Sequence, residues 1–285
     1  MRLGQIRVGG EEHVVAVDDS GRRALEFDGT MLELIRSGID PHTVRSLEEP
    51  RIATDAPLSP PLRPGKIVAI GLNYLDHIRE TGLDPPTSPL VFAKFPSTVI
   101  GPGEPIIFSP EQTARVDWEV ELGVIVGRPM RAMPVTQALD SVFGVTAAND
   151  VSARDLQFGD GQWTRGKNLD TFCPLGPMIV TLDEIGDPQD LALATRVNGE
   201  LVQSSRTSEM IFDIGELLSY CSRYFALEPG DLLLTGTPWG CGEFMEPRRS
   251  LLPGDVVEVE VERIGVLRNP VACPPASSAP RDVLC

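Results

Sequence analysis

The stretch Arg115–Val126 constrains the fold of this chain more than any other feature of the sequence. It alternates apolar and acidic residues, and successive side chains of a β-strand point to opposite faces. As one strand it would place six apolar side chains on one face and three carboxylates on the other, those of Asp117, Glu119 and Glu121. Neighbouring carboxylates on one face repel one another unless something positive lies beside them. The sequence therefore predicts a strand with one apolar face and one unusually acidic face.

The acidic face has two interpretations. It belongs either to a half-exposed antiparallel strand whose outer face meets water, or to a site in which Glu119 and Glu121 bind a hard divalent cation through oxygen. A second acidic position favours the cation. The apolar run Phe143–Ala148 ends abruptly at Asn149 and Asp150, which places another carboxylate at the end of a strand.

Length and composition limit the classes of function. A chain of 285 residues is long enough to bury a proper core, as one large domain or as a catalytic domain with a small partner. A net charge of −16 argues against nucleic acid or an anionic membrane surface as a partner. Five cysteines without a CxxC pair indicate neither a disulfide framework nor a zinc site. No apolar run is long enough to span a bilayer, and no signal peptide is recognisable, so we expect a cytoplasmic protein.

The first 63 residues have the pattern of a small α+β module. Strands are expected at residues 3–8 and 14–17, followed by a helix that begins after Thr30, with Glu33 completing a capping box, and ends near Gly38. The proline-rich residues 57–64 predict an extended linker. We place the main domain at residues 64–268 and expect a disordered tail at residues 269–285.

A histidine and a glutamate lie three residues apart directly after an apolar strand at residues 66–72. If the following segment is helical, His77 and Glu80 meet on one face, and the carboxylate orients the imidazole and raises its basicity. The pair is a candidate general base. The alternative is a surface helix with an incidental His–Glu pair.

Two lysines and one loop complete the candidates. Lys94 lies inside the apolar run 90–98, where it extends its stem to solvent or faces an anionic ligand. Lys167 lies in residues 159–177, a Gly- and Pro-rich segment that predicts a loop, and is either solvated or directed into a cleft. The Gly/Thr/Pro-rich residues 235–242 form a tight turn or an anion-binding loop.

Five motifs appear in one order along residues 64–267. They are Gly71-Leu-Asn-Tyr-x-x-His77, Asp117-Trp-Glu-Val-Glu-Leu122, Asn149-Asp-Val-Ser-Ala-Arg-Asp155, Gly166-Lys-x-x-Asp-Thr-Phe172 and Thr235-Gly-Thr-Pro-x-Gly-x-Gly242. Together they resemble the fumarylacetoacetate hydrolase superfamily. The resemblance implies an α+β, mainly β fold: a mixed β-roll with flanking helices, preceded by a small N-terminal module. It also implies a homodimer.

The resemblance assigns roles residue by residue. Glu119, Glu121 and Asp150 would bind Mg²⁺ or Mn²⁺, leaving coordination positions for water and a chelating 2-oxo acid. His77 with Glu80 would form the catalytic dyad on a lid of about residues 74–88. Lys167 would offset negative charge and bind a substrate oxygen, and Thr237 would contact the substrate carboxylate. Tyr74 and Lys94 are further substrate-binding candidates, and Phe95, Trp163 and Trp239 are expected in the pocket wall.

The implied chemistry is a stabilised enolate of a small anionic 2-oxo acid. The dyad supplies a base that activates water, so we expect hydrolysis of a C–C bond in an acylpyruvate-like 2,4-dioxo acid. The alternatives are an oxaloacetate-type decarboxylase and an isomerase or hydratase of aromatic meta-cleavage catabolism. A non-catalytic ligand-binding relative is the alternative from outside the enzymes.

Overall fold

A computed structural model of the chain describes residues 1–18, 21–46 and 55–275. Most of the secondary structure is β, as the resemblance implies, and it forms two larger sheets and a short ribbon. The larger sheet has ten strands: β1 (Arg2–Val8), β2 (Glu11–Asp18), β3 (Gly21–Ala24), β4 (Ile67–Gly71), β5 (Leu90–Lys94), β6 (Val99–Ile100), β9 (Val120–Val126), β10 (Val142–Asn149), β12 (Cys173–Val180) and β15 (Leu232–Leu234). Their order is β3-β2-β1-β12-β10-β9-β15-β4-β5, with β6 beside β12.

The second sheet has five strands in the order β14-β13-β16-β17-β7. Its members are β7 (Ile106–Ile107), β13 (Ala192–Val197), β14 (Glu200–Arg206), β16 (Val256–Val261) and β17 (Gly265–Ala272), and the ribbon consists of β8 (Val116–Asp117) and β11 (Ser152–Ala153). The α-helices are α1 (Met31–Ser37), α2 (Leu75–Thr81), α3 (Val135–Ala138), α4 (Arg154–Asp160), α5 (Thr164–Lys167), α6 (Leu182–Ile185) and α7 (Ile214–Tyr224). Short 3₁₀ turns cover Pro41–Thr43, Pro96–Thr98, Leu139–Ser141, Thr207–Glu209 and Gly242–Phe244.

The main core lies between the two sheets. Val124 of β9 and Val145 of β10 belong to one buried cluster with Val259 of β16 and Leu267 of β17. The helix α7 closes this core with Leu217 and Leu218, which project from one face of the helix. Within the described residues, no helix is long and apolar enough to cross a bilayer.

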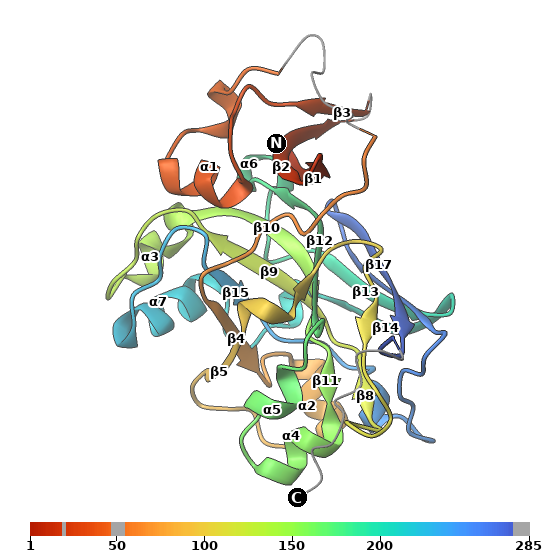
Figure 1. Cartoon of the computed structure of the whole chain (residues 1–285). Coiled ribbons are helices and arrows are strands. Elements are labelled where there is room, and N and C mark those ends of the chain that lie inside the picture. Colours follow the sequence, from red (N-terminus) through yellow and green to blue (C-terminus); the bar gives the residue numbers. More distant parts are fainter. Residues whose placement is uncertain (19–20, 47–54, 276–285) are drawn as a thin grey trace, which may run out of the picture.

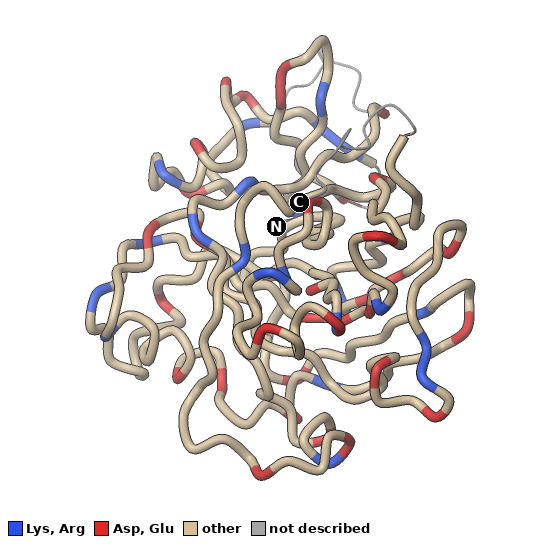
Figure 2. Tube along the Cα trace, turned by 60° about the horizontal axis from the view of Figure 1, so that its bottom comes forward, with Lys and Arg blue, Asp and Glu red and all other residues tan. Residues whose placement is uncertain are grey.

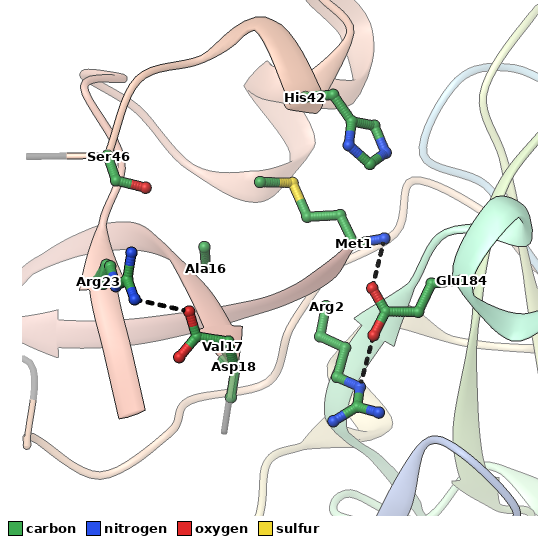
Figure 3. Close-up of a pocket in the computed structure, with 9 residues that line it drawn as sticks. All are labelled: Met1, Arg2, Ala16, Val17, Asp18, Arg23, His42, Ser46 and Glu184. Carbon is green, nitrogen blue, oxygen red and sulfur yellow. Dashed lines mark ion pairs between the residues drawn. The ribbon is translucent and has the colours of Figure 1, made fainter. Parts of the chain in front are cut away.

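The N-terminal residues extend the larger sheet. β1 pairs antiparallel with β12, and α1, with the predicted capping box at Thr30 and Glu33, packs on the same sheet. At this junction Met1 and Arg2 both contact Glu184 of α6, while Arg23 of β3 contacts Asp18 of β2 (Figure 3). Residues on both sides of the proposed boundary at residue 63 therefore contribute to one sheet and one core. These strands lie at one end of the molecule, and α4 and α5 lie at the other (Figure 1).

Three sequence-based boundaries are wrong. The predicted strand at residues 115–126 is interrupted at Trp118 and Glu119, and all three of its carboxylates are buried, so the half-exposed acidic face does not exist. The predicted loop at residues 159–177 contains α5 and the first part of β12, because β12 pairs with β10 as far as Leu175. The predicted tail begins too early, since residues 269–272 complete β17 and Asn269 is buried. Its residues 276–285 lie outside the described chain.

Candidate active site

Strand pairing brings the three predicted metal ligands together. β9 and β10 run antiparallel with Glu121 opposite Ala148, so the end of β10 lies beside the start of β9. The backbone N–H of Asp150 donates to the carbonyl of Glu119 at 2.9 Å and fixes the next turn. Oxygen atoms of Glu119, Glu121 and Asp150 all lie within 4.8 Å of one another, and each residue is buried. Glu119 reaches this cluster from the interruption between β8 and β9, outside either strand.

Lys167 lies against the carboxylates. Its Nζ donates to Glu119 Oε2 at 2.6 Å and to Asp150 Oδ2 at 2.7 Å. The short helix α5 places it there by packing tightly on α4, where a Cβ on Gly166 would lie 2.6 Å from the backbone nitrogen of Gln157. Burial tends to raise the pKa of Glu119, but Lys167 and Arg154 outweigh it and lower that pKa to about 2.

Arg154 is a further buried cation of the site. Its guanidinium lies 2.8 Å from Asp117 Oδ2 and 2.7 Å from Glu119 Oε1, and it donates to Gln157. Asp117 therefore does not join the metal cluster, although the alternating pattern placed it on the same face. Its oxygens instead hold Arg154 and accept the backbone N–H groups of Gly242 and Glu243.

The donor set fits a hard divalent cation. The backbone N–H of Gly236, whose φ of 97° favours glycine, donates to Glu121 Oε2 at 2.9 Å, and no described lysine or arginine forms an ion pair with Glu121. Burial, with the charges of Asp150 and Glu119, raises the pKa of Glu121 well above its ordinary value. An all-oxygen set of three carboxylates suits Mg²⁺ or Mn²⁺, which would offset this repulsion. Around the metal cluster the site as a whole contains four buried carboxylates and three buried cations: Asp117, Glu119, Glu121 and Asp150 with Lys94, Arg154 and Lys167.

The predicted dyad forms on α2. His77 Nδ1 lies 2.8 Å from Glu80 Oε2, and the other oxygen of Glu80 accepts the backbone N–H of Gly240 at 2.8 Å. His77 is buried and Glu80 is partly buried, so the pair does not lie on the open surface of the helix. A carboxylate on Nδ1 favours the tautomer with its proton there, leaving Nε2 as the basic nitrogen. Cys241 is also close to this pair, but burial raises the pKa of its thiol and keeps it neutral.

One cavity joins the dyad to the carboxylates. It has a volume of about 260 Å³, and His77, Glu119, Glu121, Lys167 and Thr237 all line it. The structure thus brings together most of the predicted site residues. Asp150 lies behind them, in contact with Lys167.

Four residues that were predicted to contact substrate or to form the pocket wall do not line the cavity. Tyr74 is fully buried in the main core, and Lys94 is buried against Asp150 and the backbone of Val151 and Lys167. Neither side chain lines the cavity. Lys94 instead supports Asp150 from behind, and direct contact of either residue with substrate stays a prediction. Of the expected wall residues, Trp163 lines the cavity, whereas Phe95 and Trp239 do not.

Gln203 is the residue that sequence reasoning missed entirely. It is fully buried, and its side-chain carbonyl accepts from the Val120 backbone and from Thr195, while its Nε2 donates to Thr237 at 3.0 Å. It ties the loop that carries Thr237 to the strand that carries Glu121. A glutamine in a hairpin strand has no local signal that marks such a role.

Comparisons with known proteins show which proteins this chain is similar to. A family model described as fumarylacetoacetate (FAA) hydrolase C-terminal matches residues 66–272. The mitochondrial oxaloacetate tautomerase FAHD2B of Bos taurus is 44% identical over 253 residues, covering 85% of this chain and 79% of the relative. An uncharacterised protein of Archaeoglobus fulgidus is 50% identical over 210 residues, covering 74% of this chain and 80% of the relative.

Solved structures show the same similarity. A fumarylacetoacetate hydrolase from Exiguobacterium antarcticum has a TM-score of 0.85 and 37% identity, covering 96% of this chain and 100% of its own. A 2-hydroxyhepta-2,4-diene-1,7-dioate isomerase from Mycobacterium marinum has a TM-score of 0.77 and 37% identity, covering 96% of this chain and 98% of its own.

Proposed function

Since this chain belongs to the fumarylacetoacetate hydrolase family, we propose that it is a divalent-metal-dependent enzyme that transfers a proton at C3 of a 2-oxo acid. Keto–enol tautomerisation is the reaction that the site and the named relatives together support best. The observation that carries the proposal is the cavity shared by the His77–Glu80 dyad and the buried carboxylates. Relatives named as oxaloacetate tautomerases and a solved structure named as an isomerase support it.

Glu119, Glu121 and Asp150 would hold Mg²⁺ or Mn²⁺. When bound, such a cation acts as a Lewis acid that favours negative charge on the 2-oxo oxygen. Lys167, already in contact with two of the carboxylates, keeps a positive charge near the same oxygen. Thr237 lines the cavity and contributes a hydroxyl for the substrate carboxylate, its position fixed by Gln203.

The dyad moves the proton. Nε2 of His77 takes a proton from C3, and Glu80 stabilises the imidazolium that forms. The electron pair of the C–H bond becomes the C2–C3 double bond, and the proton returns to the former carbonyl oxygen. The product is the enol, with no atom gained or lost. Gly240 holds Glu80 in position throughout, because its N–H occupies the second carboxylate oxygen.

Hydrolysis of a 2,4-dioxo acid is the second candidate. The same dyad favours it, because His77 would then activate water for attack on the distal carbonyl, and pyruvate enolate would leave. Decarboxylation of oxaloacetate passes through that enolate as well. The carboxylate site is common to all three reactions and does not separate them.

Parallel assays with the full chain separate these reactions. Oxaloacetate and acetylpyruvate are incubated with Mg²⁺ or Mn²⁺, with and without chelator, while enol absorbance and pyruvate release are followed. We expect chelator-sensitive equilibration of the oxaloacetate tautomers, and its loss in His77→Gln. Acetate and pyruvate from acetylpyruvate without tautomerisation would favour the hydrolase, and pyruvate and CO₂ from oxaloacetate would favour the decarboxylase.

Two properties remain proposals. The homodimer rests on the family resemblance, and sedimentation velocity at micromolar concentration tests it. The relatives FAHD2A and FAHD2B are named as mitochondrial, whereas the composition of this chain led us to expect a cytoplasmic protein. Fractionation of cells that express the chain decides its compartment.

A further inference from the structure

The cavity has a charged end and an apolar end. The charged end contains the buried carboxylates. One lysine and one arginine line the cavity, Lys167 and Arg154, and both form ion pairs with these carboxylates. Two phenylalanines lie next to the charged groups. The ring centre of Phe92 lies 5.1 Å from Lys167 Nζ, and the ring centre of Phe244 lies 5.4 Å from that of His77. Apolar side chains thus begin where the charged groups end.

The mouth of the cavity is also apolar. Leu83 is 54% exposed and Phe158 is 51% exposed, although both line the cavity. Trp163 continues this wall, with its ring centre 5.2 Å from that of Phe92. Large apolar side chains gathered around one opening mark a binding surface.

We propose that the enzyme selects 2-oxo acids whose C3 substituent is apolar, such as an aryl or branched alkyl group, over 2-oxo dicarboxylic acids. This specificity rests on the proposed function. With the carboxylate and 2-oxo group at the charged end, the substituent lies along Phe92, Phe158 and Trp163. A second carboxylate there would lie against apolar side chains, and no lysine or arginine among the described lining residues is free of a carboxylate partner to receive it.

Turnover of two substrates tests the inference. The Mg²⁺-loaded protein is assayed for enol formation with phenylpyruvate and with oxaloacetate, and we expect kcat/KM to favour phenylpyruvate by about tenfold or more. A higher kcat/KM for oxaloacetate would overturn the inference and leave the proposed function standing.

Binding separates this inference from the proposed function. Calorimetry on the Mg²⁺-loaded protein compares phenylglyoxylate, which has no proton to lose, with 2-oxoglutarate, a dicarboxylate. If neither substrate is turned over, the proposed function fails, and the order of these two affinities still decides the specificity. Tighter binding of phenylglyoxylate supports the apolar site, and equal or weaker binding overturns it.

Two variants with matched controls locate the specificity. Leu83→Arg places a cation at the mouth and should shift the ratio of kcat/KM values towards oxaloacetate, whereas Leu201→Arg, at a leucine 52% exposed outside the cavity, should not. Phe158→Ala should raise KM for phenylpyruvate, while Phe95→Ala, at a phenylalanine 49% exposed outside the cavity, leaves it unchanged. Equal effects of each variant and its control would contradict the assignment.

Discussion

At the scale of residues, Gln203 connects two parts of the site, the loop that carries Thr237 and the strand that begins at Val120. Its side-chain oxygen accepts the backbone N–H of Val120, and its side-chain nitrogen donates to the hydroxyl oxygen of Thr237. We expect Gln203→Leu to lower the free energy of unfolding by about 2 kcal/mol or more, because buried polar groups lose their partners. Urea denaturation measures this, with Gln137→Leu as the exposed control. Equal losses in the two variants would contradict the role of Gln203.

Glu121 is the carboxylate that most needs a cation. Its neighbours Glu119 and Asp150 are ion-paired with Lys167, whereas Glu121 receives the N–H of Gly236. We expect Glu121→Gln to weaken Mn²⁺ binding by at least about tenfold, and to remove most of the rise in Tm that Mn²⁺ gives the wild type. Calorimetry and thermal melts measure both. Glu243→Gln, a buried carboxylate outside the cluster, is the control, and the cation site is wrong if the two variants bind Mn²⁺ alike.

At the scale of elements, α7 carries the clearest test. Asp213 caps it, accepting the N–H of Glu216 at 2.7 Å, and the side chain of Glu216 accepts the N–H of Asp213 in return. We expect Asp213→Ala to cost about 1 kcal/mol in the free energy of unfolding. Asp213→Asn keeps an acceptor oxygen and should cost much less. Equal destabilisation of both variants in urea would show that the cap contributes little.

Elements encoded by neighbouring residues could be predicted from the sequence, and those set by distant partners could not. The capping box at Thr30 and Glu33 and the His77–Glu80 spacing are local, and the structure has both of them. Asp117, next to the interruption at Trp118, pairs with Arg154, which is distant in sequence, and β12 starts early where it pairs with β10. The metal cluster was predicted from the family motifs, whereas its burial required the fold.

At the scale of the whole molecule, the charge of −16 should govern how anions reach the site. Figure 2 shows Asp and Glu along the whole trace with Lys and Arg between them. At saturating Mg²⁺, we expect kcat/KM for the dianion oxaloacetate to rise as NaCl goes from about 0.02 to 0.2 M, because salt screens the repulsion. The monoanion phenylpyruvate should show a smaller rise. A fall for both would mean that the approach is dominated by local positive charge.

The central claim is that His77, beside a cation-binding carboxylate cluster, transfers a proton at C3 of a 2-oxo acid. Its most direct test is NMR of deuterium entering C3 of 2-oxobutanoate in D₂O, with the full-length protein and Mg²⁺. We predict exchange that stops with chelator and in His77→Gln, while His77→Gln still binds Mn²⁺. Exchange that continues in His77→Gln at the wild-type rate, or that ignores the chelator, would contradict the account.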